Sequence, residues 1–253
     1  MTELVHSTVS AGVATLTLDS PPNRNALSAQ LMSELAAALA AAVASDEVRV
    51  VVLSHTGRVF CSGADLRATA AATASGDMPI ASVPSLLEAL AASPKPTVAR
   101  VGGPARAGGI GLLAACDLAV AGRSATFAFT EVRLGVVPAV ISVPVLPLLT
   151  ARAARELLLT GEVFDADWAL AAGLLTAVVA DEDLDAEVAR YAGMLALGAP
   201  GALAATKALL RAPSTDYAEL AALSASHFAG PEGREGVAAF TEKRRPSWAP
   251  PQP

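Results

Sequence analysis

Hydrophobic and polar residues alternate at the start of the chain. Residues 4–9 and 13–18 show the two-residue period that is typical of half-buried strands. The small residues between them, 10–12, end in a glycine and favour a tight turn. The pattern therefore predicts that the chain opens with a β-hairpin.

A helix and three buried strands are predicted next. Ser28 is a suitable N-cap for a helix that ends before Ser45, because leucines follow it at helical spacing. Residues 48–53 and 96–101 are apolar, β-branched runs of the kind that is buried in parallel sheets, and residues 118–121 are predicted as a third short strand. Helices that alternate with such strands indicate an α/β fold with crossover connections.

The pattern changes to mostly helical from about residue 151. One short strand is predicted at residues 176–179, and residues 67–80 are too weakly patterned to predict anything but a loop. We divide the chain into a core, residues 1–195, and a C-terminal helical region, residues 196–253. From residue 151 onward, helices are predicted at residues 152–159, 165–172, 183–197, 200–211 and 217–228.

Composition and charge exclude several classes of protein. The 253 residues are 53% hydrophobic and 17% charged, and the net charge of −6 comes without a long basic run, which argues against a nucleic-acid partner. Cys61 and Cys116 form no C-x-x-C pair, which fits a reducing compartment and two buried thiols. The N-terminal sequence lacks the basic and apolar regions of a signal peptide, and no run is apolar enough for a membrane span. We expect a cytoplasmic protein without a membrane partner.

Three turn-rich stretches near predicted strands are the candidate site. They are PPNRNALS at residues 21–28, GRVFCSGADL at residues 57–66 and GGPARAGGIG at residues 102–111. The second and third each follow a predicted buried strand, so both can bring backbone amides to one edge of a sheet. Two amides that converge on one point form an oxyanion hole.

Other sites fit the sequence less well. The stretch GIGLLA matches the dinucleotide-binding fingerprint, but seven residues separate its first glycine from the preceding predicted strand, where the fingerprint requires a direct strand-to-helix turn. A nucleophile elbow is excluded because Phe60 stands where the motif needs glycine. The three histidines have no metal-ligand spacing, and no metal site is predicted.

The order of the motifs resembles the crotonase, or enoyl-CoA hydratase/isomerase, family. The motifs are PPNRNALS, RVFCSGADL, GGPARAGGIGLLAACDLAVA, TFAFTEVRLGVVPA and GREGVAAFTEKRRPSW, and together they span nearly the whole chain. The resemblance implies a spiral of ββα turns with a C-terminal helical trimerisation region. It also implies a homotrimer or a dimer of trimers, an acyl-CoA thioester substrate, and no cofactor besides the coenzyme A of that substrate.

The resemblance also assigns residues to the site. The backbone amides of Ala64 and Gly108 are expected to hold the thioester oxygen, with Gly108 at a helix N-terminus where the dipole favours negative charge. Small side chains there let the ligand approach the backbone. Coenzyme A binding is carried over to Arg24, Ala26, Ser62, Asp65, Leu66 and Arg67, and across a subunit boundary to Phe240 and Lys243.

Glu131 is the expected acid/base. Hydratases of this family commonly place two glutamates at the substrate double bond; counting from the family motifs, Gly111 stands at the first place and Glu131 at the second. A carboxylate over an apolar pocket has a shifted pKa and can move a proton. The alternative for Glu131 is a surface ion pair with Arg133.

Three functions remain open. The favoured one is hydration of a 2-enoyl-CoA by Glu131 alone, and the alternatives are Δ3,Δ2-enoyl-CoA isomerisation or binding of acyl-CoA without turnover. TEVRLGVVPAVIS, together with Gly111, looks most like bacterial hydratases of methylglutaconyl-CoA-type substrates. Arg106 either pairs with the distal carboxylate of such a substrate or faces solvent. The pocket walls are expected from residues 67–80 and 137–149.

Overall fold

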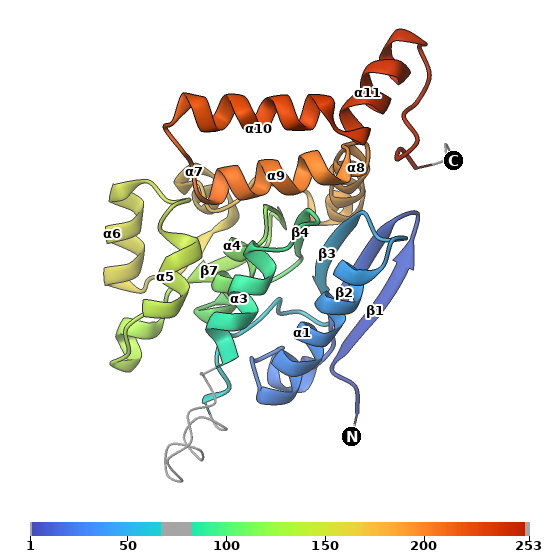
Figure 1. The fold of residues 1–253 in the computed structure, drawn as a ribbon. Coiled ribbons are helices and arrows are strands. Elements are labelled where there is room, and N and C mark those ends of the chain that lie inside the picture. Colours follow the sequence, from blue (N-terminus) through green and yellow to red (C-terminus); the bar gives the residue numbers. More distant parts are fainter. Residues whose placement is uncertain (1, 67–81, 251–253) are drawn as a thin grey trace.

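The computed structural model describes residues 2–66 and 82–250 (Figure 1). A six-stranded sheet has the order β1-β2-β3-β4-β6-β9, in which β1 pairs antiparallel with β2 and the other neighbours are parallel. Its strands are β1 (Val5–Ser10), β2 (Val13–Leu18), β3 (Val50–His55), β4 (Thr97–Val101), β6 (Leu118–Gly122) and β9 (Ala177–Val179). The predicted hairpin is confirmed, with Val5 opposite Leu18.

A smaller sheet stands beside the site. It has the order β5-β7-β8, with β5 parallel to β7 and β7 antiparallel to β8. Single bridges from Cys61 to Ala105 and from Leu27 to Ala64 tie the predicted site loops to this sheet and to each other. The strands are β5 (Ala105–Arg106), β7 (Thr126–Ala128) and β8 (Phe164–Asp165).

Helices surround the sheets and complete the α/β fold. The α-helices are α1 (Ala29–Ala44), α3 (Val83–Ala91), α4 (Gly108–Ala115), α5 (Ala139–Val145), α6 (Ala151–Thr160), α7 (Ala166–Ala172), α8 (Leu184–Ala196), α9 (Pro200–Arg211), α10 (Tyr217–Ala229) and α11 (Pro231–Thr241). Short 3₁₀ helices are η1 (Pro21–Asn23), η3 (Glu131–Leu134) and η4 (Asp181–Asp183). Ser28 caps α1 by accepting a hydrogen bond from the Leu31 amide, as predicted.

Both faces of the main sheet are buried, which explains the continuous apolar runs in its central strands. On one face Val51 and Leu53 of β3 belong to the main core together with α1, α3 and α4. On the other face Val50 and Val52 pack with α8 through residues such as Val188. Cys61 and Cys116 are buried free thiols, and burial raises the pKa of each to about 12.

The C-terminal helices are fixed to the core by charged side chains. Lys207 of α9 donates to the Asp117 carboxylate at 2.5 Å and to the carbonyl of Lys95 at 3.0 Å, and this lysine side chain is only 10% exposed. Asp117 also accepts from the backbone amide of Thr97, so the ion pair joins α9 to β4 and to the start of β6. In Figure 1, α9 and α10 lie above the sheet, with α11 beside them.

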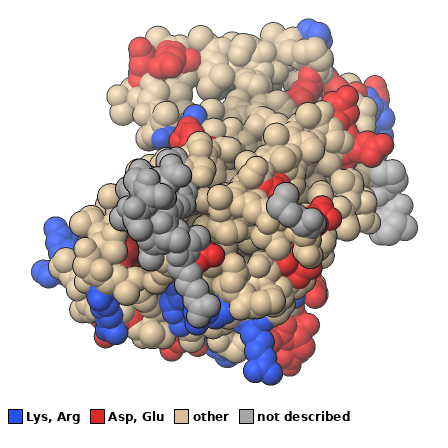
Figure 2. Space-filling view, turned by 90° about the horizontal axis from the view of Figure 1, so that it is seen from below, with Lys and Arg blue, Asp and Glu red and all other residues tan. Residues whose placement is uncertain are grey.

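The surface has mixed charge and exposed apolar side chains. On the face seen from below, small groups of Lys and Arg and small groups of Asp and Glu are spread around the rim, and most of the surface between them is uncharged (Figure 2). Val137 and Val143 are 77% and 72% exposed, and Phe240 is 87% exposed. Within the described residues no single helix is long and apolar enough to cross a membrane, although α8 with its preceding turn and α9, bent by 107°, meet the length and composition criteria as a pair.

Most predicted elements are confirmed to within two residues at each end, and several elements were not predicted. Helix α9 has the predicted bounds, and the strand predicted at residues 48–53 is found at Val50–His55. Helices α3, α5 and α11 were not predicted, nor were the short strands of the second sheet. The loop predicted at residues 67–80, with Arg67, lies outside the described residues.

Candidate active site

The three turn-rich stretches meet at one cavity of about 260 Å³. Ala64, Ala107, Gly108 and Glu131 all line it. The wall predicted at residues 137–149 is confirmed in its first part, because residues 137–141 line the cavity. The large apolar residues of the lining are Leu27, Leu66, Val83, Leu134, Val136, Val137, Val140 and Ile141.

A buried asparagine holds the first stretch in place. Asn25 is fully buried, accepts a hydrogen bond from the Ser20 amide at 2.7 Å, and donates to the carbonyls of Thr56 and Val59. Arg24 and Asn25 have φ angles of +60° and +52°, a left-handed conformation that asparagine tolerates better than most residues. Asn25 was not predicted as a site residue; its signal in the sequence is a turn-forming asparagine directly before the apolar pair Ala26–Leu27.

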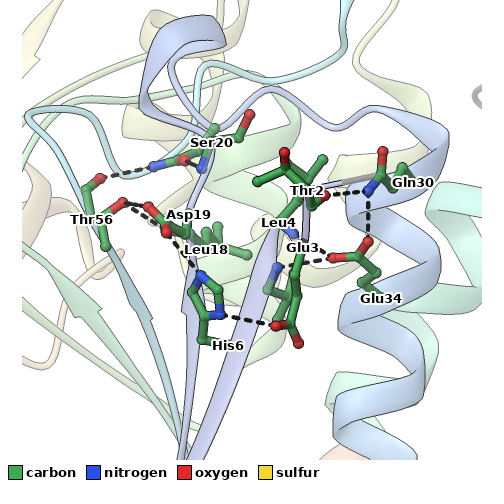
Figure 3. A network of polar contacts seen from close by, with 12 residues as sticks. Thr2, Glu3, Leu4, His6, Leu18, Asp19, Ser20, Gln30, Glu34 and Thr56 are labelled. Carbon is green, nitrogen blue, oxygen red and sulfur yellow. Dashed lines mark hydrogen bonds and ion pairs between the residues drawn. The ribbon is translucent and has the colours of Figure 1, made fainter.

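Polar contacts of Thr56 support the same stretch from the sheet side (Figure 3). The Thr56 hydroxyl donates to Asp19, and Asp19 pairs with His6 at 2.8 Å. These contacts lower the pKa of Asp19, and the hydrogen bond to Asp19 raises the pKa of His6. The turn after β2 is therefore fixed to the end of β3.

The second stretch lies directly against the first. The Leu27 amide donates to the Gly63 carbonyl at 2.8 Å, and the Ser62 amide donates to the Arg24 carbonyl at 3.1 Å. Gly63 has a φ angle of +85°, which suits glycine, and a Cβ there would lie 3.3 Å from the Gly108 nitrogen. The Ala64 and Gly108 backbones are thus brought together, as predicted.

The third stretch turns sharply at Ala107. This residue has a φ angle of +48° and a ψ angle of −118°, a conformation that normally requires glycine, and α4 begins at the next residue. The turn places the Gly108 amide at the first position of α4, where the helix dipole favours negative charge. The prediction that this amide lies at a helix N-terminus is confirmed.

The amides of Ala64 and Gly108 are both available to a ligand. Neither donates a hydrogen bond to any residue that the structure describes. A Cβ at Gly108 would lie 3.9 Å from the Ala64 nitrogen, so both amides border the same small space. Unpaired backbone donors are rare unless water or a ligand satisfies them, and two such donors suit a carbonyl oxygen that gains negative charge.

Glu131 faces this cavity from the start of η3. Its Oε2 atom is buried and has no hydrogen-bond partner among the described residues. Burial raises the pKa of the Glu131 carboxyl, and a hydrogen bond from its own backbone amide offsets only part of this rise. Arg133 donates to the Thr160 carbonyl at 3.0 Å instead, so the alternative of a Glu131–Arg133 surface pair is wrong.

The place of the first family glutamate is closed in this chain. A Cβ at Gly111 would lie 2.7 Å from Cγ2 of Ile141 and 3.4 Å from Cδ1 of Leu87. Ile141 itself lines the cavity, whereas Gly111 does not. Packing between α4 and α5 therefore takes up the space directly beside Gly111, where the side chain of a glutamate would begin.

Arg106 does not reach the cavity. Its guanidinium donates to the Ala105 carbonyl and to the hydroxyl and carbonyl of Thr126, so it is held along the second sheet. The described residues that line the cavity include no Lys, Arg or His. Among the described residues, no group of three His, Cys, Asp or Glu side chains is arranged to hold a metal ion.

Some of the expected coenzyme A-binding residues lie at or beside the cavity, and others do not line it. Ser62 and Leu66 line the cavity, Ala26 is buried directly before Leu27, and Asp65 follows Ala64. Arg24 is exposed on the neighbouring stretch. Phe240 and Lys243 lie at the end of α11 and do not line the cavity of their own chain.

The cavity and the comparisons with known proteins agree. Residues 8–251 match the model of the family described as enoyl-CoA hydratase/isomerase. The chain belongs to the enoyl-CoA hydratase/isomerase family. It is accordingly an enzyme of the enoyl-CoA hydratase or enoyl-CoA isomerase type.

Individual relatives cover almost the whole chain. An enoyl-CoA hydratase structure from Mycobacterium avium is 45% identical with a TM-score of 0.76, and it covers 98% of this chain and 100% of its own. The structure of Pseudomonas aeruginosa AtuE is 37% identical with a TM-score of 0.92, at the same coverage of both chains. Human enoyl-CoA hydratase domain-containing protein 3, mitochondrial, is 32% identical over 94% of this chain and 81% of its own. The predicted α/β, crotonase-like fold is thereby confirmed.

Proposed function

We propose that this enzyme adds water to the double bond of a 2-enoyl-CoA thioester, with Glu131 as its single acid/base. The observation that carries the proposal is the buried, unpartnered Oε2 of Glu131 in the cavity that the Ala64 and Gly108 amides border. A buried carboxylate oxygen without a partner is costly to the fold, and such groups cluster at sites where they do chemistry.

One carboxylate is sufficient for the proton balance of the reaction. Ionised Glu131 takes a proton from water while the oxygen of that water bonds to the β-carbon of the substrate. The electrons of the double bond move to the thioester oxygen, and the enolate is stabilised by the Ala64 and Gly108 amides. Glu131 then returns the proton to the α-carbon. Loss of one such amide donor costs about 2.7–4 kcal/mol of barrier in other enzymes.

Isomerisation is the second candidate, and the packing at Gly111 favours it. Moving a double bond from Δ3 to Δ2 needs a base that removes one proton and returns it to another carbon. Glu131 alone supplies that, and no second carboxylate is needed. Gly111 carries no such carboxylate, and Ile141 packs against the position where its side chain would begin.

Separate incubation with a 2-enoyl-CoA and a 3-enoyl-CoA tests the proposal. Hydration gives a hydroxyacyl-CoA that is heavier than the 2-enoyl-CoA by one water, detected by mass spectrometry. Formation of only the shifted alkene would replace hydration by isomerisation. Turnover that persists in Glu131→Gln would contradict the assignment of Glu131 in both reactions, since general acid/base groups contribute about 10²–10⁴-fold.

The lining supports a substrate with an uncharged acyl tail. Its described side chains near Glu131 are almost all apolar, and Arg106, the expected partner of a distal carboxylate, is bound to Thr126. The observations therefore favour a plain or branched enoyl-CoA over a methylglutaconyl-CoA-type substrate. A panel that includes both kinds of thioester tests this, and a higher kcat/KM for the carboxylated substrate would overturn it.

Phe240 and Lys243 complete the proposed site from a neighbouring subunit. They are exposed on one chain and absent from its cavity, which fits a role across a subunit boundary in a homotrimer or a dimer of trimers. The exposed apolar side chains of α5, α6 and α11 support such an assembly.

A further inference from the structure

Hydration by one carboxylate leaves a question of geometry. The attacking water must be held with one O–H toward Glu131 and a lone pair toward the β-carbon, and a single hydrogen bond leaves it free to rotate. Gly111 supplies no second carboxylate, and Ile141 packs against the position where a side chain at residue 111 would begin. Another polar group beside Glu131 is therefore needed.

Few polar side chains are available for this task. Among the described residues that line the cavity, the polar side chains are those of Ser62, Thr130 and Glu131. Ser62 belongs to the same loop as Ala64. Its backbone amide donates to the Arg24 carbonyl, and its hydroxyl lies 3.5 Å from the Asn23 carbonyl. Thr130, in contrast, is the chain neighbour of Glu131.

The Thr130 hydroxyl makes no hydrogen bond to the described part of the protein. Thr130 occupies the N-cap position of η3, but its side chain makes no capping hydrogen bond. Its hydroxyl has no hydrogen-bond partner in the described part of the chain, while its carbonyl accepts from the Arg133 amide at 3.1 Å. Thr130 lines the cavity, and a hydroxyl without a partner in the protein is available to a water molecule.

We propose that Thr130 is the positioning residue for the attacking water. Its Oγ1 atom accepts a hydrogen bond from one O–H of that water, the other O–H points to Glu131, and the free lone pair is left for the β-carbon. This inference rests on the proposed hydration. It gives Thr130 no part in proton transfer to or from the α-carbon, which Glu131 performs alone.

The test separates water addition from proton transfer. Exchange of the α-protons of a saturated acyl-CoA for deuterium in D₂O needs only Glu131 and the two amides, whereas hydration also needs oriented water. Thr130→Val keeps the shape of the side chain and removes the hydroxyl. We expect it to lower the kcat of hydration by about 10–100-fold, with unchanged KM and exchange rate.

Control variants make each outcome decisive. Thr130→Ser should restore hydration to within a few-fold of the wild type, and Thr8→Val, the same substitution on the exposed strand β1, should change neither reaction. Hydration at the wild-type rate in Thr130→Val, equal loss of both reactions, or no recovery in Thr130→Ser would each overturn the assignment. A wild-type enzyme that exchanges α-protons but never adds water would instead refute the proposed hydration itself.

Discussion

The Cβ position of Gly111 lies 2.7 Å from Cγ2 of Ile141, so a missing side chain in α4 is filled by a side chain of α5. Ile141 is buried and also lines the cavity beside Glu131. The loss of the first family glutamate and the shape of the cavity wall are therefore one structural change. A carboxylate cannot be restored at Gly111 without moving α5.

Gly111→Glu is expected to destabilise the protein rather than to repair a second acid/base. The new side chain meets Ile141 and Leu87 and brings a carboxylate into an apolar environment, which together cost about 2–4 kcal/mol. Urea denaturation followed by circular dichroism measures this as a lower free energy of unfolding. The double variant Gly111→Glu/Ile141→Ala should recover part of the loss, because it removes the overlapping atoms. Equal stability of Gly111→Glu and the wild type would show that α5 can shift to make room for the new side chain at little cost.

The stability of the protein should depend on the ionisation of Glu131. Burial raises the pKa of Glu131 in the folded state above its unfolded value. Between these two pKa values the folded protein binds more protons than the unfolded chain, so stability falls as the pH rises through this window. Gln at this position mimics the protonated carboxyl at every pH.

Thermal unfolding of the wild type and Glu131→Gln from about pH 4 to about pH 8 checks this. The two melting temperatures should be similar at the acid end, and Glu131→Gln should become the more stable protein as the pH rises. The acid limb of the activity profile should also lie above the ordinary glutamate pKa. A difference in melting temperature that does not change with pH would contradict the burial of this carboxylate.

Periodicity predicted the central strands and the N-cap of α1, because these depend on local sequence. The site residues Ala64, Gly108 and Glu131 were assigned through the resemblance to the family, since nothing local in the sequence brings such distant residues together. The two-residue strands β5 and β8 are too short for a periodic pattern, and they form only where another segment lies beside them. The packing of Ile141 against Gly111 was not predicted either, because the two residues are distant in sequence. Asn25 was missed because a turn asparagine and a buried anchor look alike in a sequence.

Ala107→Gly should stabilise the protein. A non-glycine residue in a sparsely populated conformation costs about 1–3 kcal/mol, and glycine recovers this while losing about 0.5–1 kcal/mol through its flexible unfolded state. The net gain is expected to be about 1 kcal/mol in the free energy of unfolding. Ala115→Gly, at the last residue of α4, the helix that Ala107 precedes, is the control at a helical position and should be destabilising. A loss of stability in Ala107→Gly would mean that the Ala107 methyl group contributes more by packing than its backbone costs.

Two impaired variants should restore activity to each other when they share an oligomer. Lys243 is exposed at the end of α11, far in sequence from the cavity of its own chain, and is proposed to bind the coenzyme A of a neighbour. Lys243→Ala should raise KM, since one charged contact to a phosphate is lost, and Glu131→Gln should lower kcat.

If the subunits of the two variants are unfolded and refolded together, some interfaces combine an intact Glu131 with an intact Lys243 from the next chain. Mixed refolding should then give a kcat/KM above the average of the two variants refolded separately, and light scattering should show a trimer or hexamer. Activity equal to that average would place Lys243 outside the site. A wild-type protein that is a monomer in light scattering and still binds coenzyme A would do the same.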